Sequence, residues 1–224
     1  MDRTAEFEYT IAGRPDFSLL TVQLPVDRSI KVEAAAMAAM DTNVNMKTQF
    51  RGGLGRLVTG ENIFVNEFTA EGGPAEVLIA PAAPGDLEHV YLDNNTIFLQ
   101  SKAFVASGLG VAVETKWQGM LKGFFSGAGL FLLRCSGVGD LFFNAFGALN
   151  SFEIDGTHVV DNGHVVAFTE GLEYEIDVIA GYKSFFFSGE GLVCRFRGHG
   201  RVWVQTRQLP AFAAWMYPYR PSKR

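Results

Sequence analysis

One six-residue pattern occurs three times, at spacings of 67 and 61 residues: Asp27-Arg28-Ser29-Ile30-Lys31-Val32, Asn94-Asn95-Thr96-Ile97-Phe98-Leu99 and Asp155-Gly156-Thr157-His158-Val159-Val160. Each copy begins with residues typical of a two-residue Asx-type turn and continues into an apolar strand. The alignment continues without gaps, since Ala39, Ala106 and Ala167 correspond. We call these three regions the strand blocks. A repeat of this period predicts a fold built from similar, adjoining units.

A second pattern, the glycine block, also occurs three times, at spacings of 67 and 62 residues: Thr59-Gly60-Glu61-Asn62-Ile63, Ser126-Gly127-Ala128-Gly129-Leu130 and Ser188-Gly189-Glu190-Gly191-Leu192. We expect each glycine block to open a strand pair with a glycine-rich turn, at Gly137-Val138-Gly139 and Gly198-His199-Gly200. The two kinds of block alternate along the chain, beginning with a strand block and ending with a glycine block.

This order predicts that one unit is split between the two ends of the chain. Unit A would comprise residues 1–58 and 189–207, unit B residues 59–125 and unit C residues 126–188, within one compact body of 1–224. Because an unpaired strand edge is unfavourable, we expect Val202–Thr206 to lie in the unit that contains Leu20–Met46, in the same chain or a neighbouring one.

Alternation of apolar and polar residues predicts an all-β fold. It is clearest in Leu172–Val178, where Glu173, Glu175 and Asp177 share one face. The alanine-rich stretch 32–40 favours a helix by propensity alone, but its counterparts 99–107 and 160–168 are rich in β-branched and aromatic residues, which predicts a strand. A short helix is expected only in the tail 208–224, after Gln208 and ending at Pro218.

Composition restricts the class of protein. Of the 224 residues, 48% are hydrophobic and 19% are charged, which is enough to bury a core and excludes a disordered chain. No apolar run approaches the about 20 residues that a spanning helix requires, and the N-terminal residues do not resemble a secretory signal. We therefore expect a cytoplasmic protein without a membrane span, in which Cys135 and Cys194 are buried and reduced.

The candidate chemical motifs are weak. His158, Asp161 and His164 could share one side of a strand and bind a metal ion, but the Asp161-Asn162-Gly163 turn breaks that alternation, so we predict no metal site. Residues 51–56 are glycine-rich and could hold an anion, although a connection between blocks is the better interpretation. No nucleophile elbow, paired Cys-x-x-Cys motif or phosphate loop occurs. We predict no catalytic residues, no cofactor and no enzymatic activity.

Charge is distributed unevenly. Residues 195–224 contain seven basic and no acidic residues, so the first 194 carry a net charge of −12 within a total of −5. This basic segment could favour a phosphate backbone, an anionic membrane or an acidic neighbouring strand block. We favour the third interpretation, because the repeat already requires this segment to be paired.

Several motifs together resemble the altered-inheritance-of-mitochondria family, over about residues 10–208. They are Gly60-Glu61-Asn62-Ile63-Phe64, Ala80-Pro81, Pro84-Gly85-Asp86, Gly-Leu-Phe-Leu around Gly129, Ser136-Gly137-Val138-Gly139, and the Gly198–Gly200 turn followed by Val204-Gln205-Thr206-Arg207. The resemblance implies a TRAP-like fold, with short double-stranded β-helix or sandwich modules, three per chain, related to the trp RNA-binding attenuation protein. It also implies a homotrimer that forms a ring of nine modules, with no catalytic residues to transfer.

These observations favour a non-enzymatic, ring-forming scaffold or interaction protein. The alternative is binding of a small ligand or a nucleic acid at grooves between modules, as in the attenuation protein. RNA binding on a ring would need a basic residue at the same place in every module, yet Lys31, Phe98 and Val159 correspond. We therefore expect no specific nucleic acid as a partner, while a small ligand stays open.

Overall fold

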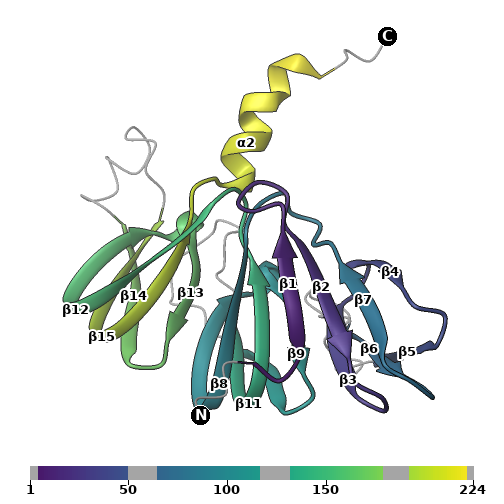
Figure 1. The fold of residues 1–224 in the computed structure, drawn as a ribbon. Coiled ribbons are helices and arrows are strands. Elements are labelled where there is room, and N and C mark those ends of the chain that lie inside the picture. Colours follow the sequence, from purple (N-terminus) through teal and green to yellow (C-terminus); the bar gives the residue numbers. More distant parts are fainter. Residues whose placement is uncertain (1–4, 50–64, 117–131, 179–191, 221–224) are drawn as a thin grey trace.

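The computed structural model describes residues 5–49, 65–116, 132–178 and 192–220, and all structural statements below concern these ranges (Figure 1). The strands are β1 (Glu8–Ala12), β2 (Leu19–Leu24), β3 (Ser29–Glu33), β4 (Met37–Met40), β5 (Val44–Gln49), β6 (Val65–Ala70), β7 (Ala75–Ile79), β8 (Leu87–Gln100), β9 (Phe104–Gly108), β10 (Val111–Lys116), β11 (Leu132–Asn144), β12 (Leu149–Asp161), β13 (Val165–Thr169), β14 (Leu172–Val178) and β15 (Leu192–Gln205). The helical elements are α2 (Leu209–Met216) and the short 3-10 turns η2 (Ser101–Ala103), η3 (Asn162–His164) and η4 (Tyr217–Tyr219). The predicted all-β fold is confirmed.

The strands form two antiparallel sheets. A four-stranded sheet has the order β1-β2-β7-β4, and an eleven-stranded sheet has the order β12-β15-β13-β8-β11-β9-β3-β6-β5, with β10 added on β11 and β14 on β15. In the first third of the chain (β1–β7), β2 pairs with β7 and β3 pairs with β6. In the middle third (β8–β11), the long pair of β8 with β11 takes the place of both short pairs. In the last third (β12–β15), the long pair of β12 with β15 does the same.

Strand positions follow the spacing of the sequence pattern. The strands β4, β9 and β13 begin at residues 37, 104 and 165, and β5, β10 and β14 begin at 44, 111 and 172. Both series are separated by 67 and then 61 residues, as are the six-residue patterns. The alanine-rich stretch forms β3, a turn with Ala35 at a φ of 67°, and β4, so the prediction of strand over helix is confirmed.

The prediction that one unit is split between the chain ends is wrong. Both edges of β15 are occupied within the last third, by β12 on one side and by β13 and β14 on the other. Val202 lies opposite Phe152 and Phe168, not against the first strand block. The first strand block pairs with β6 and β7, which follow it. Each strand block therefore pairs with the strands that come after it, and the predicted boundaries at 58, 125 and 188 fall between strands that pair with each other.

The predicted glycine-rich turns are also wrong, because β11 and β15 continue through them as extended chain. Gly137 and Gly198 have φ angles of 119° and 121°, which favour glycine. A Cβ atom at Gly198 would lie 2.4 Å from the carbonyl oxygen of Gly171, so glycine also permits a close approach of two backbones. The second and third six-residue patterns likewise lie inside β8 and β12, and Asn94 forms an extra residue in β8 opposite the Gly137–Val138 step.

Three clusters of buried side chains form the core, roughly one for each third. The first lies between the β2–β7 and β3–β6 pairs and includes Leu20, Ile30 and Phe68. The second is centred on the middle third and the last on β12–β15, where Phe168 and Phe196 are almost completely buried. Burial of each such side chain contributes about 1.5–3 kcal/mol. Because the clusters share residues across neighbouring thirds, the thirds depend on one another for their cores.

Candidate functional site

Two similar junctions connect the thirds of the chain. At the first, β3 pairs with β9, and Lys31 lies opposite Ser107. At the second, β8 pairs with β13, and Phe98 lies opposite Phe168. By the repeat spacing, Lys31 corresponds to Phe98, and Ser107 corresponds to Phe168. The two junctions therefore have the same register.

Both junctions are buried. All five residues of β9 and the first four of β13 are inaccessible to solvent. The Lys31 ammonium, on a residue only 4% exposed, donates to the carbonyl oxygens of Leu109 and Val111, which satisfies a charge in the junction. At the corresponding place Phe98 and Phe168 stack with ring centroids 5.1 Å apart. Different side chains therefore fill the same position.

The strands that would continue this pattern lie at the ends of the sheets. The counterpart of β9 and β13 is β4, which pairs with β7 alone in the described chain and exposes Ala38, Ala39 and Met40. The counterpart of β3 is the second half of β12, which pairs only with β15 and exposes residues 157–159. We call Met37–Met40 and Thr157–Val160 the two open edges.

Both open edges carry apolar side chains. Met40 is 38% exposed and Val159 is 42% exposed. Natural edge strands are more often protected by charges, proline or bulges, because an apolar edge invites pairing with another chain. These edges are the candidate functional site, because a strand of another chain could pair with each of them.

The two residues just before β1 are held by a buried carboxylate, Asp140 of β11. It accepts hydrogen bonds from the backbone N–H groups of Glu6 and Phe7 at 2.9–3.0 Å and lies 2.9 Å from Nε2 of His89. Asp140 is fully buried. Tyr9 packs on the His89 ring, with centroids 4.5 Å apart, and its pKa is raised by burial and then by the Asp140 charge. This cluster connects β1 to the middle third.

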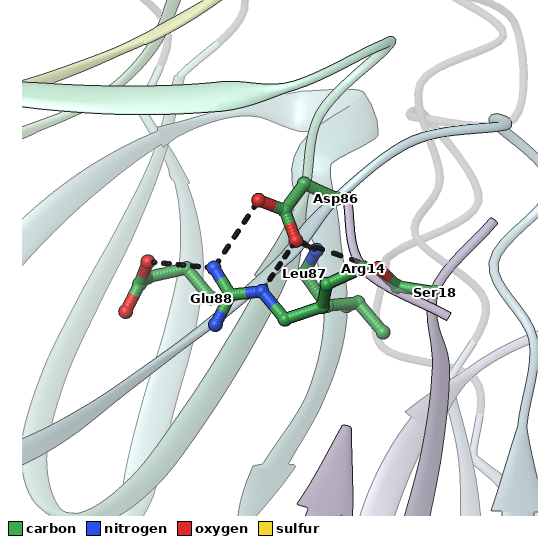
Figure 2. A network of polar contacts seen from close by, with 5 residues as sticks. All are labelled: Arg14, Ser18, Asp86, Leu87 and Glu88. Carbon is green, nitrogen blue, oxygen red and sulfur yellow. Dashed lines mark hydrogen bonds and ion pairs between the residues drawn. The ribbon is translucent and has the colours of Figure 1, made fainter. Parts of the chain in front are cut away.

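A second buried carboxylate, Asp86, holds the turn between β1 and β2 (Figure 2). Its Oδ1 accepts from Arg14 Nε at 2.7 Å, from Ser18 Oγ at 3.4 Å and from the Leu87 N–H at 2.9 Å. Arg14 also lies 3.6 Å from Glu88, and its pKa is raised mainly by the hydrogen bond to Asp86. The contacts join the first third to the start of β8, so the network is structural.

Sequence reasoning missed both carboxylates. Asp86 belongs to the Pro84-Gly85-Asp86 motif, which was a signal of the family but not of this role. Asp140 lies 134 residues from Glu6, so no spacing along the chain indicates their contact.

The structure does not bring the candidate metal ligands together. His158 packs against Phe152 at 5.1 Å, whereas His164 Nδ1 lies 2.6 Å from the carbonyl oxygen of Gln205. Asp161 accepts from the Gly163 N–H and from Gln208. In the described ranges, no group of three or more His, Cys, Asp or Glu residues is placed to hold a metal ion. The glycine-rich residues 51–56 and most of the three glycine blocks lie outside the described residues.

The cysteine prediction is confirmed. Cys135 and Cys194 are both buried and free. Burial raises the pKa of each thiol to about 12, and the Cys194 thiol donates to Asn162. Both thiols are therefore protonated at neutral pH, and neither is a nucleophile there.

Much of the basic C-terminal charge faces acidic residues of the last third. Arg197 and Arg195 of β15 lie opposite Glu173 and Glu175 of β14, and Arg201 contacts Glu153 at 2.6 Å. The carboxylates on one face of β14 thus lie beside arginines of β15, a pairing that the sequence pattern alone did not predict. An acidic strand block does receive the basic segment, but it is the third one.

No helix in the described ranges is both long and apolar enough to cross a membrane.

Comparison with known proteins agrees with the motifs. A protein of Streptococcus pyogenes serotype M6, itself uncharacterised, is 30% identical over 96% of this chain and 91% of its own length. A crystal structure of a Streptococcus pyogenes protein superposes with a TM-score of 0.81 at 29% identity, covering 96% of this chain and all of that one. The model of a family described as mitochondrial biogenesis AIM24 matches residues 9–207. Because this match spans most of the chain, the protein belongs to the mitochondrial biogenesis AIM24 family.

Proposed function

We propose that the protein is a non-enzymatic cytoplasmic scaffold that assembles into a closed ring of three copies through its two open edges. The observation that carries this proposal is the difference in burial between equivalent strands. The strands β9 and β13 are buried in junctions, whereas β4, in the equivalent place, exposes three of its four residues. The same junction between copies would cover β4 with the second half of β12.

The register of that junction follows from the two junctions within the chain. Lys31 opposite Ser107 and Phe98 opposite Phe168 become, at the next repeat, Val159 opposite Met40 of a second copy. This pairing would bring together two apolar side chains that are each about 40% exposed in the single chain. It is a head-to-tail contact, which leaves no open edge only when the ring closes.

The number three comes from the TRAP-like resemblance, which implies nine modules in a ring. A scaffold role is supported by the buried ionisable groups, since Lys31, Asp86 and Asp140 each hold elements of the fold together. Nucleic-acid binding between modules has less support, because Lys31 is buried in a junction and its counterparts Phe98 and Val159 carry no charge.

A cysteine pair tests the register. We expect the double variant Met40→Cys/Val159→Cys to form, on mild oxidation, disulfides between chains, because directly opposite residues of antiparallel strands have Cβ atoms about 4.5–5.5 Å apart. The end product should be a covalent species of three times the 24.5 kDa chain mass, reversible by reductant. The native thiols do not compete because they are buried.

The matched control is Met40→Cys/Val138→Cys, since Val138 is 41% exposed but lies away from both open edges. Light scattering of the unmodified protein should give the trimer mass. A monomer at micromolar concentration, or cross-linking that is equally efficient in the control, would exclude the proposed ring.

A further inference from the structure

The segment after β15 is an apolar surface with no polar side. Residues 209–219 contain no charged residue, and α2 spans eight of them. Its large side chains are exposed in the single chain: Leu209 (55%), Phe212 (43%), Trp215 (62%), Met216 (44%), Tyr217 (58%) and Tyr219 (71%). A helix that packs on a protein surface keeps a polar face toward water, whereas one that is apolar on all sides is buried in protein or lipid.

The helix projects from the β sheets (Figure 1). At its base, Phe212 packs on Phe146 with ring centroids 5.5 Å apart. The row of rings continues outward from Phe212 to Trp215 at 5.9 Å and to Tyr219 at 5.7 Å. The aromatic row is therefore presented at a distance from the sheets.

Basic charge accompanies this row and has no acidic partner in the described chain. Arg220 lies 3.7 Å from the centre of the Tyr217 ring, whereas Arg201 of β15 is engaged by Glu153. The sequence adds Lys223 and Arg224, and contains no acidic residue after Glu190. The β15 arginines thus serve the fold, and the last basic residues are a separate group.

We propose that α2 and the basic residues after it bind the surface of an anionic lipid bilayer. Trp215, Tyr217 and Tyr219 are of the residue types that concentrate at membrane interfaces, where one end of the ring is apolar and the other contacts water. Basic residues beside an apolar segment add attraction to anionic headgroups. With eight residues, α2 is shorter than the about 20 that a spanning helix needs, so it lies in the interface.

Two observations favour lipid over a protein partner. The helix has no polar side to leave toward water beside a protein, and the basic residues that follow it in the sequence complement anionic headgroups. The family match ends at residue 207, before α2, so the feature is separate from the matched fold. It is also independent of the open edges, which lie on β4 and β12.

Vesicle flotation of the full chain tests this proposal. We expect binding to phosphatidylcholine vesicles that contain about 30% phosphatidylglycerol to be at least about tenfold stronger than binding to phosphatidylcholine alone. The variant Phe212→Ser/Trp215→Ser should lose binding about tenfold or more, since it removes the largest inserted side chains. Brominated lipids should quench Trp215, an effect identified by comparison with Trp215→Phe.

Charge is tested with a matched pair of variants. Arg220→Gln/Arg224→Gln should weaken binding about tenfold or more, because each basic residue near the surface contributes about fivefold. Lys47→Gln/Lys102→Gln removes the same charge from exposed positions on β5 and η2 and should leave binding within about twofold of the parent. Equal loss in both pairs, absence of binding to the anionic vesicles, or unquenched Trp215 would overturn the proposal. Light scattering distinguishes a protein contact, because dissociation of the oligomer by Phe212→Ser/Trp215→Ser would assign α2 to a second copy instead.

Discussion

Replacing Asp140 by alanine tests how strongly a buried carboxylate holds the residues before β1 on the middle third. Asp140 is fully buried and accepts from the backbone N–H groups of Glu6 and Phe7. The alanine variant leaves both donors without this acceptor. An unsatisfied buried donor costs about 1–3 kcal/mol, so for two donors we expect the free energy of unfolding to fall by about 2–6 kcal/mol.

The chain contains a matched control. Asp155 and His199 form the same kind of pair as Asp140 and His89, at the same 2.9 Å separation. The side chains of the control pair are more than 80% exposed, whereas those of the buried pair are at most 9% exposed. Exposed pairs contribute little in water, so Asp155→Ala should change stability by about 0.5 kcal/mol or less.

Urea unfolding of both variants measures the difference, at one protein concentration because the proposed assembly would contribute to stability. Hydrogen exchange at the Glu6 and Phe7 amides should accelerate in Asp140→Ala and not in Asp155→Ala. If the two variants lost the same small free energy, burial would not be the quantity that separates the two pairs, and the assigned role of Asp140 would be wrong.

Three further predictions concern other parts of the fold. Burial raises the pKa of Glu33 to about 7, so the folded state binds the Glu33 proton more tightly than the unfolded state does. The stability that this protonated group contributes is fully present below about pH 4.5 and is lost as the pH rises through 7. Glu33→Gln should therefore unfold at a higher urea concentration than the parent at pH 8 but not at pH 4. A thiol reagent at pH 8 should leave Cys135 and Cys194 unmodified in the native protein and modify both in denaturant, because burial raises both pKa values to about 12. Deletion of residues 192–224 should yield no soluble protein on expression, since it removes β15 and its pairing with β12, β13 and β14. Deletion of the residues after Tyr219 should leave the melting temperature within about 2 °C of the parent in thermal denaturation.

Local patterns were sufficient for the individual strands. The alternation in Leu172–Val178 predicts β14 with its observed bounds. The repeat identifies residues 37–40 as strand against their helix propensity, because the counterparts contain β-branched and aromatic residues. The alanine-rich tail after Gln208 predicts a short helix that Pro218 stops, and α2 ends at Met216.

Pairing between strands was not contained in those patterns. In an alternating series of strand and glycine blocks, a glycine block can pair with the strand block before it or with the one after it. What decides is the opposition of whole strands, such as Arg195 and Arg197 facing Glu175 and Glu173. The buried carboxylates were missed for a related reason, since Asp140 acquires its partners only when β1 is brought to β11.

The candidate site was identified by comparing the surroundings of equivalent residues in the three repeats, which requires both the repeat and the structure. Lys31, Phe98 and Val159 occupy one position in the three copies of the strand block. The first is buried with its charge satisfied by two carbonyl oxygens, and the second is stacked on Phe168. The third is exposed at the end of a sheet, yet it is a valine, and the strand that would lie opposite it ends in an exposed Met40. Because a solvent-facing edge is normally protected by charge, two apolar side chains in register at opposite ends of the same chain support the proposal that these edges meet between copies.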